Sequence, residues 1–304
     1  MYTRTRTRLI VGVALAALTA ISTSNHATAA PSRAAQTISN IEYAPAQPAG
    51  SKGHLLDLYL PDTGNTLWPL VMSSSQAVFP AQVYDIKAAV RWLRAHAAQY
   101  RLDPDRFALM GDSSGGWVAD MATMTGGVAS LEGDIGTTGV SSSVQAGVGL
   151  FGPTDFLQMN AQRLPGGLDH DAANSPESML MGCAIQTCPD KVGQANPITY
   201  VDQNDPPMLL AHGQADLLVP HGQSVLLYDA IKAKCGNARF FSVPDAGHGA
   251  QDVLNPSHYG AQTVRTTTGC QESTSTGAPD LSWDTIAEFL DDALNVGGTS
   301  TARR

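Results

Sequence analysis

Hydrophobic residues recur along the chain in short, mostly apolar runs that alternate with longer amphipathic stretches. The short runs predict strands over residues 55–60, 107–110, 146–151, 208–211 and 239–243. Apolar residues spaced three and four positions apart, and the segments between the runs, predict helices over residues 80–98, 115–125, 221–233 and 282–295. Apolar strands joined by helices are typical of a buried parallel sheet with crossover connections. We therefore expect one α/β domain, with a mostly parallel sheet and helices on both faces.

The first 29 residues have the pattern of a secretory signal peptide. Three arginines precede an apolar stretch over residues 9–21, and Ala27-Thr28-Ala29 provides a cleavage site of small residues. The apolar stretch is too short for a bilayer span, which takes about 20 residues, and no later segment is long enough either. We expect a secreted protein with a leader over residues 1–29, a flexible lead-in over 30–40, the α/β domain over 41–296 and a flexible tail over 297–304.

Composition and charge narrow the classes of function. Hydrophobic residues make up 43% of the chain, which is enough for a sizeable core. The 18 basic residues are outnumbered by 27 acidic ones, giving a net charge of −9, and no basic run could track a phosphate backbone. Nucleic acid is therefore excluded as the main partner.

Four cysteines are present, Cys183, Cys188, Cys235 and Cys270. An even number of cysteines in an exported chain indicates disulfides, and four allow three connectivities. We favour a local Cys183–Cys188 bridge and a longer Cys235–Cys270 bridge, which would close a ring that contains His248. Zinc is the alternative, but the C-x-x-C and His-x-x-x-His spacings typical of zinc sites are missing, so no metal is expected.

The segment Gly111-Asp112-Ser113-Ser114-Gly115 matches the pattern G-x-S-x-G between a predicted strand and a predicted helix. A sharp turn at this place exposes the serine hydroxyl, and the helix that follows favours negative charge on a substrate. Ser113 is thus a candidate nucleophile, and the backbone N–H of Ser114 is a candidate oxyanion donor. The alternative is an ordinary glycine-rich turn.

Two further candidates follow later predicted strands. Asp216 comes shortly after the strand over 208–211, and His248 comes shortly after the strand over 239–243. Because the carboxyl ends of parallel strands meet at one edge of a sheet, a carboxylate there can orient an imidazole that acts as general base. The order Ser113, Asp216, His248 excludes a trypsin-like protease, which has its histidine and aspartate upstream of the serine. A helix-capping aspartate and a surface histidine are the alternatives.

With these motifs the chain resembles the α/β-hydrolase superfamily and, within it, the bacterial feruloyl-esterase-like (BD-FAE) esterase/lipase family. Other segments that carry the resemblance lie at residues 56–61, 79–93, 152–155, 175–178 and 195–201. The resemblance implies hydrolysis of carboxylic esters, on small molecules or polymers, through an acyl-serine intermediate and without a cofactor or metal. It also implies that Ser113 is the nucleophile, His248 the base and Asp216 the acid that orients it.

The chain departs from the family in one segment. The resemblance calls for a His-Gly-Gly loop that supplies half of the oxyanion hole, followed by a helix and a strand. No His-Gly-Gly occurs between Leu60 and Pro80. We therefore expect a fold that lacks part of strand 3, helix A and strand 4, with a strand stub over 70–72 and a short loop over 73–78. Two alternatives to an active esterase stay open, namely an inactive or truncated relative and a peptidase of the prolyl-oligopeptidase type.

Overall fold

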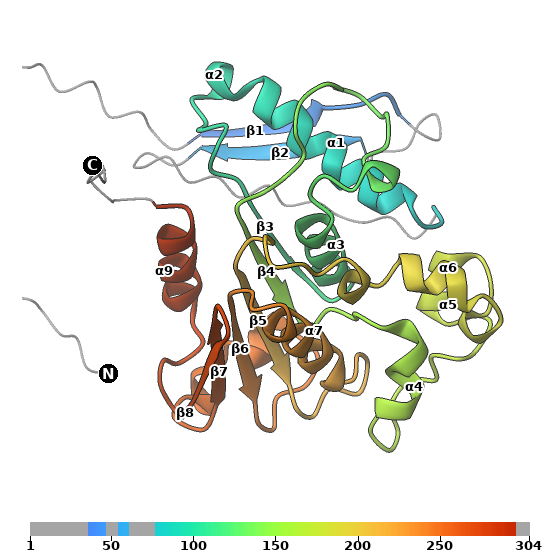
Figure 1. Ribbon diagram of the computed structural model, residues 1–304, viewed down its shortest axis with the longest axis vertical. Coiled ribbons are helices and arrows are strands. Elements are labelled where there is room, and N and C mark those ends of the chain that lie inside the picture. Colours follow the sequence, from blue (N-terminus) through green and yellow to red (C-terminus); the bar gives the residue numbers. More distant parts are fainter. Residues whose placement is uncertain (1–35, 47–53, 61–76, 296–304) are drawn as a thin grey trace, which may run out of the picture. The chain divides into compact units, whose positions relative to one another are not determined.

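Four parallel strands form the centre of the sheet in the computed structural model, which describes residues 36–46, 54–60 and 77–295 (Figure 1). These strands are β3 (Ala108–Asp112), β4 (Ala146–Leu150), β5 (Met208–Gly213) and β6 (Ala238–Val243). They are hydrogen-bonded in the order in which they occur in the chain. Each overlaps a strand predicted from the sequence, and all four end at the same edge of the sheet.

An antiparallel hairpin extends the sheet beyond β6. Its strands are β7 (Thr263–Thr268) and β8 (Gln271–Thr276), and β7 pairs with β6. The sequence did not predict this hairpin, because β8 is polar and exposed at every position and β7 is mostly threonine. The sheet is thus mostly parallel, as expected, with an antiparallel edge.

A separate two-stranded sheet is formed by β1 (Gln36–Glu42) and β2 (Leu55–Leu60). The second of these strands was predicted from its apolar residues. The first begins inside the segment 30–40 that was expected to be a flexible lead-in, so that expectation is corrected from Gln36 onward. The strand forms because it pairs its backbone with β2, although most of its side chains are exposed.

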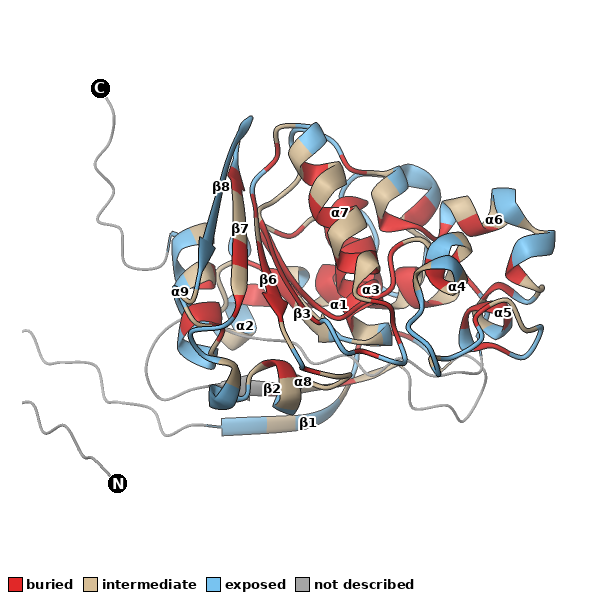
Figure 2. Ribbon diagram, turned by 90° about the horizontal axis from the view of Figure 1, so that it is seen from below, coloured by how far each residue is buried: buried red, intermediate tan, exposed pale blue. Residues whose placement is uncertain are grey.

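Helices cover both faces of the central sheet. The longer ones are α1 (Ala81–Ala95), α3 (Ser114–Met124), α7 (Gly222–Ala233) and α9 (Trp283–Ala293). Leu210 of β5 packs in one cluster with α7, whereas its neighbour Leu209 packs in another cluster with α9. Because successive residues of a strand point to opposite faces, these two helices lie on opposite sides of the sheet. Figure 2 shows buried residues gathered in β6 and in the helices α3 and α7; α7 packs against β5 and β6, whereas α3 packs against β3 and β4.

Shorter helices complete the fold. They are α2 (Ala97–Tyr100), α4 (Met159–Gln162), α5 (Pro176–Met181), α6 (Pro189–Gln194) and α8 (Ala250–Val253). The segment with α4 to α6 connects β4 to β5 and forms a lobe beside the sheet (Figure 1). In the described part of the chain, no helix is long and apolar enough to cross a membrane.

Several expectations concern residues that the structure does not describe. The expected leader over 1–29, the tail over 297–304 and the strand stub over 70–72 lie outside the described residues. Among the described strands, β2 pairs with β1 alone and β3 pairs with β4 alone.

All four cysteines are paired, and the pairs are the two that the sequence favoured. Cys183 is bonded to Cys188, and Cys235 is bonded to Cys270. The second bridge joins the turn between β7 and β8 to the segment before β6, at the amino end of that strand. The bridge closes a covalent ring that contains His248. However, the bridge lies at the amino end of β6, whereas His248 lies beyond its carboxyl end, at the opposite edge of the sheet.

Candidate active site

Ser113 occupies the tight turn between β3 and α3. Its backbone has φ 53° and ψ −123°, a conformation that residues with a side chain rarely adopt and that costs about 1–3 kcal/mol. The turn is possible because residue 111 is glycine, since a Cβ there would lie 2.1 Å from the carbonyl oxygen of Gly115. The strained turn places the hydroxyl of Ser113, which is half-buried, at the edge where the parallel strands end.

Ser114 is the first residue of α3, so its backbone N–H has no acceptor within the helix. The helix continues from the turn, because the N–H of Trp117 donates to the carbonyl of Ser113 at 3.1 Å. The free N–H groups and the positive end of the helix dipole therefore lie beside the Ser113 hydroxyl. A negative charge that develops on a substrate next to Ser113 would be stabilised there.

The structure brings the three candidate triad residues together. His248 Nε2 lies 2.8 Å from Ser113 Oγ, and His248 Nδ1 lies 2.7 Å from Asp216 Oδ2. A carboxylate only accepts hydrogen bonds, so Nδ1 carries the hydrogen and Nε2 is left to accept the serine proton. This is the geometry that a nucleophile, a general base and an orienting acid require.

The carboxylate of Asp216 is buried yet well supplied with donors. Its Oδ1 accepts the backbone N–H groups of Leu218 at 2.8 Å and Val219 at 2.9 Å. Burial by itself would raise the pKa of Asp216, but hydrogen bonds from His212, His248 and the Val219 N–H outweigh burial and hold this pKa below its usual range. Asp216 is therefore ionised and fixed in position where it meets His248.

Phe151 is a site residue that the sequence did not reveal. It follows β4 directly, has a positive φ of 41° and is buried. Its ring packs edge-on against the His248 imidazole, with 4.8 Å between the ring centroids. A bulky residue in this conformation is rare, and here the conformation places the Phe151 ring in contact with the candidate base.

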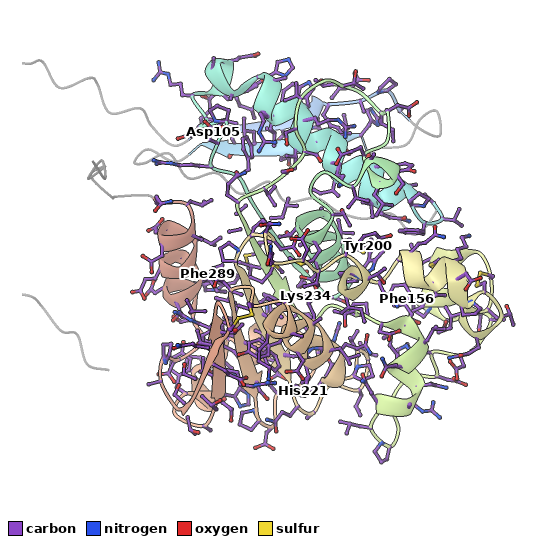
Figure 3. The ribbon with its side chains drawn as sticks, in the orientation of Figure 1. Asp105, Phe156, Tyr200, His221, Lys234 and Phe289 are labelled. Carbon is purple, nitrogen blue, oxygen red and sulfur yellow. A yellow bond between two sulfur atoms is a disulfide. The ribbon has the colours of Figure 1, made fainter. Side chains whose placement is uncertain are left out.

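Two more histidines lie near Asp216, and the sequence predicted a role for neither of them. His212, at the end of β5, places Nε2 3.3 Å from Asp216 Oδ2. His221, labelled in Figure 3, lies before α7 with its Nε2 2.8 Å from Ser242 Oγ. Burial, with a smaller contribution from His212, lowers the pKa of His221 to about 4, so this imidazole is neutral at physiological pH. No spacing in the sequence shows the proximity of His212 and Asp216, because His212 ends strand β5 and Asp216 lies in the loop that follows.

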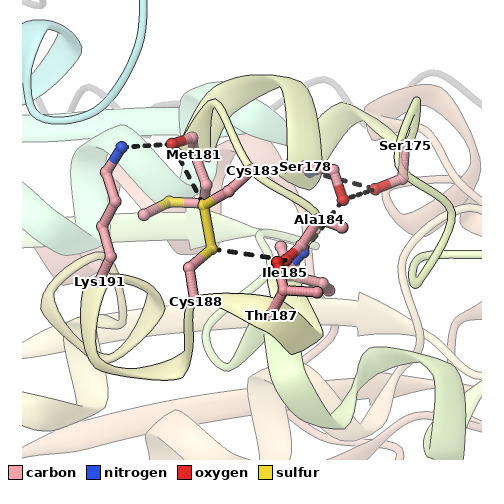
Figure 4. Close-up of a disulfide and its surroundings, with 9 residues drawn as sticks. All are labelled: Ser175, Ser178, Met181, Cys183, Ala184, Ile185, Thr187, Cys188 and Lys191. Carbon is pink, nitrogen blue, oxygen red and sulfur yellow. Dashed lines mark hydrogen bonds between the residues drawn. A yellow bond between two sulfur atoms is a disulfide. The ribbon is translucent and has the colours of Figure 1, made fainter.

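The lobe between β4 and β5 attaches next to the nucleophile helix. Trp117, one turn after Ser113, donates its indole N–H to the carbonyl of Ala195 at 2.7 Å and packs against Phe156. Figure 4 shows the Cys183–Cys188 disulfide, which links the segments of α5 and α6 inside this lobe. The lobe is thus held to α3 on one side and braced internally by a covalent bond.

Nothing in the described part of the chain groups three or more histidine, cysteine or acidic side chains as a metal site would need. His248 is placed to transfer a proton, and Ser113 is placed to act as a nucleophile.

Comparison with known proteins gives a consistent set of relatives. Residues 70–231, just over half of the chain, match the family model described as BD-FAE. That match contains Ser113 and Asp216 and ends before His248. Esterase LipQ of Mycobacterium tuberculosis is 28% identical over 177 residues, which span 58% of this chain and 40% of that protein. Esterase LipC of the same organism is 27% identical over 183 residues, 60% of this chain and 44% of that protein. The chain spans less than half the length of these two curated relatives.

Solved structures with the same fold cover more of the chain. A truncated form of a carbohydrate esterase from gut microbiota has a TM-score of 0.68 and 27% identity, over 88% of this chain and 99% of that chain. The bifunctional GH43-CE of Bacteroides eggerthii has a TM-score of 0.65 and 30% identity, over 86% of this chain and 38% of that chain. The fold around the site is therefore that of an α/β hydrolase.

Proposed function

Because this chain belongs to the BD-FAE family, we propose that it is a serine hydrolase of carboxylic esters that acts through an acyl-serine intermediate. The observation that carries the proposal is the contact of His248 with both Ser113 at 2.8 Å and Asp216 at 2.7 Å. In this mechanism His248 takes the proton of Ser113 while Oγ attacks the ester carbonyl, and then returns it to the leaving alcohol. Water repeats the two steps and releases the acid.

We propose esters on small molecules or on polymers as the substrates. One structural neighbour is described as a carbohydrate esterase, which makes an acetylated oligosaccharide the first natural substrate to test. The direct test of the activity is hydrolysis of p-nitrophenyl acetate by the purified chain beside Ser113→Ala. Activity that disappears in the variant supports the proposal. An inactive wild-type chain would favour the inactive-relative alternative, and cleavage of peptides in preference to esters would favour a peptidase.

We propose further that the rate is low. The sequence between Leu60 and Pro80 has no His-Gly-Gly, so the donor identified for the oxyanion is the N–H of Ser114. Loss of one oxyanion donor costs about 3–4 kcal/mol, or a factor of about 10²–10³ in rate. Inserting a His-Gly-Gly loop with its helix and strand after Met72 should raise kcat by about 10² if a donor is missing. No gain from a folded insertion variant would show that another group already completes the hole.

Secretion is the third part of the proposal. It is supported by the leader pattern in residues 1–29 and by the pairing of all four cysteines, since disulfides persist in oxidising compartments. Expression of the full chain in a secreting host, followed by N-terminal sequencing of protein in the medium, tests it. A mature N-terminus at Ala30 is expected, and uncleaved protein retained in the cells would contradict it.

A further inference from the structure

His212 is a fully buried histidine whose ring lies against the carboxylate of Asp216. Its Nε2 is 2.9 Å from the carbonyl oxygen of Val219 and 3.3 Å from Asp216 Oδ2. Its Nδ1 is 2.8 Å from Ser224 Oγ on α7. Both nitrogens thus have fixed partners on two different elements, the loop after β5 and the helix α7.

The hydrogen on Nε2 follows from these partners. A carbonyl oxygen and a carboxylate oxygen only accept hydrogen bonds, so a ring nitrogen that faces both must carry a hydrogen. This holds whether or not Nδ1 is also protonated, because the hydroxyl of Ser224 can either donate or accept. His212 therefore presents one N–H to the Val219 carbonyl and to Asp216 at the same time.

Asp216 needs such a donor. Its side chain is fully buried, and in the described part of the chain no lysine or arginine pairs with it. Two backbone N–H groups satisfy Oδ1, and His248 and His212 approach Oδ2. A buried carboxylate that loses a donor is destabilised and less firmly held in place.

We propose that His212 is a positioning residue, which fixes the Asp216 carboxylate toward His248 through the hydrogen on Nε2. The inference deepens the proposed function, on which it rests. The ring is itself held in place, by Ser224 on one side and by the rings of Phe151 and His221 at centroid distances of 6.4 Å and 5.6 Å. Among the described residues, the titratable groups around the carboxylate are His212, His221 and His248.

The role of His212 has a consequence that a merely space-filling residue would not have. The N–H of His212 takes up part of the negative charge on Oδ2, which lowers the attraction of this oxygen for the imidazolium that His248 becomes. Without that N–H the carboxylate would be less firmly placed, so kcat would fall. The charge on Oδ2 would also stabilise the imidazolium more, so the acid limb of the pH–rate profile would move to higher pH.

The test compares His212→Gln with His212→Asn. The amide nitrogen of Gln can reach the position of Nε2, whereas the amide of Asn reaches only the position of Nδ1 beside Ser224. The two variants have the same polar group, so a difference between them reports the donor to Asp216. His96→Met, at the end of α1, controls for the loss of a histidine elsewhere.

We expect His212→Asn to lower kcat for p-nitrophenyl acetate by about 10–100-fold, which is less than the roughly 10⁴-fold loss caused by removing the orienting acid. The acid limb of the pH–rate profile of this variant should lie at higher pH than that of wild type. His212→Gln should stay within about five-fold of wild type, with an unmoved limb. Folded variants with equal kcat and equal limbs would overturn the proposal.

A second measurement does not depend on turnover or on the folding of a His212 variant. In ¹⁵N-labelled wild-type and Ser113→Ala protein, NMR of the imidazoles should show a slowly exchanging hydrogen on His212 Nε2. A bare Nε2 would overturn the proposal even if the protein is an esterase. If Nε2 is protonated but the chain hydrolyses no ester, the contact between His212 and Asp216 stands and the proposed function is wrong.

Discussion

Replacing Asp216 by Asn changes one atom group and almost no volume, so it isolates the acid of the proposed triad. The backbone N–H groups of Leu218 and Val219, at 2.8 Å and 2.9 Å, require an acceptor at the position of Oδ1. The amide oxygen must therefore stay there, and the NH₂ group takes the position of Oδ2, 2.7 Å from His248 Nδ1. A donor now faces a donor, and His248 avoids this by moving its hydrogen from Nδ1 to Nε2.

With its hydrogen on Nε2, His248 can no longer accept the proton of Ser113. Loss of the correct tautomer in a triad costs about 10⁴ in kcat. At 1.36 kcal/mol per factor of ten, this is about 5.4 kcal/mol of transition-state stabilisation. The buried NH₂ group also faces His212, so we expect a further loss of about 1–3 kcal/mol in the free energy of unfolding.

The assay is kcat for p-nitrophenyl acetate, with thermal unfolding followed by circular dichroism. Asp291→Asn, an exposed position on α9, is the matched control and should behave as wild type. A folded Asp216→Asn variant that keeps kcat within about ten-fold of wild type would refute the reasoning. In that case something other than Asp216 orients His248.

Three further outcomes follow from the same structure. Gly111→Ala should lower both activity and stability, because its Cβ would lie 2.1 Å from the backbone of Gly115. Gly115→Ala should be tolerated, because beyond its chain neighbours and its own helix backbone the nearest atom to the new Cβ is Asp112 Oδ1 at 4.0 Å. Equal melting temperatures and equal kcat values for the two variants would count against the strained turn. Replacing Cys235 and Cys270 by Ser should lower the free energy of unfolding by about 3–4 kcal/mol on the loop-entropy model, as measured by urea titration. The folded variant should keep its kcat, because the bridge lies away from the site. A loss of kcat without a loss of stability would contradict that placement. Asp120 is buried with an unpartnered oxygen, and burial raises its pKa well above the usual 3.8, so the folded state holds a proton that the unfolded state releases. The free energy of unfolding should therefore fall as pH rises above about 4, by about 1.4 kcal/mol per pH unit between the unfolded and the folded pKa. Asp120→Asn should remove this dependence in urea titrations at pH 5 and 8.

The parts of the fold that the sequence predicted are those with apolar patterns of sufficient length. The strand over 146–150 is buried at every position, and α9 has a clear apolar stripe, so both are visible as hydrophobic patterns. The hairpin of β7 and β8 was missed because it pairs through its backbone and exposes threonine and serine. The helices of the lobe were missed because α4, α5 and α6 have only four to six residues each, too few for a helical period to appear.

The sequence predicted those site residues that belong to a motif or follow a predicted strand. Ser113, Asp216 and His248 stand out because each follows a strand and has a reactive side chain. Phe151 and His212 do not, since their roles depend on a positive φ and on a contact across two elements. These features arise from tertiary structure, and a run of apolar residues with a histidine inside it indicates only a strand.

The central claim is that Ser113 forms a covalent acyl intermediate. Wild-type protein and Ser113→Ala are mixed with p-nitrophenyl acetate, quenched with acid after the first turnover, and digested for peptide mass mapping. The account predicts one acetyl group on the peptide that contains Ser113 in the wild type and an unmodified peptide in the variant. Ester hydrolysis that proceeds equally in both proteins, with no acetyl group on that peptide, would contradict it.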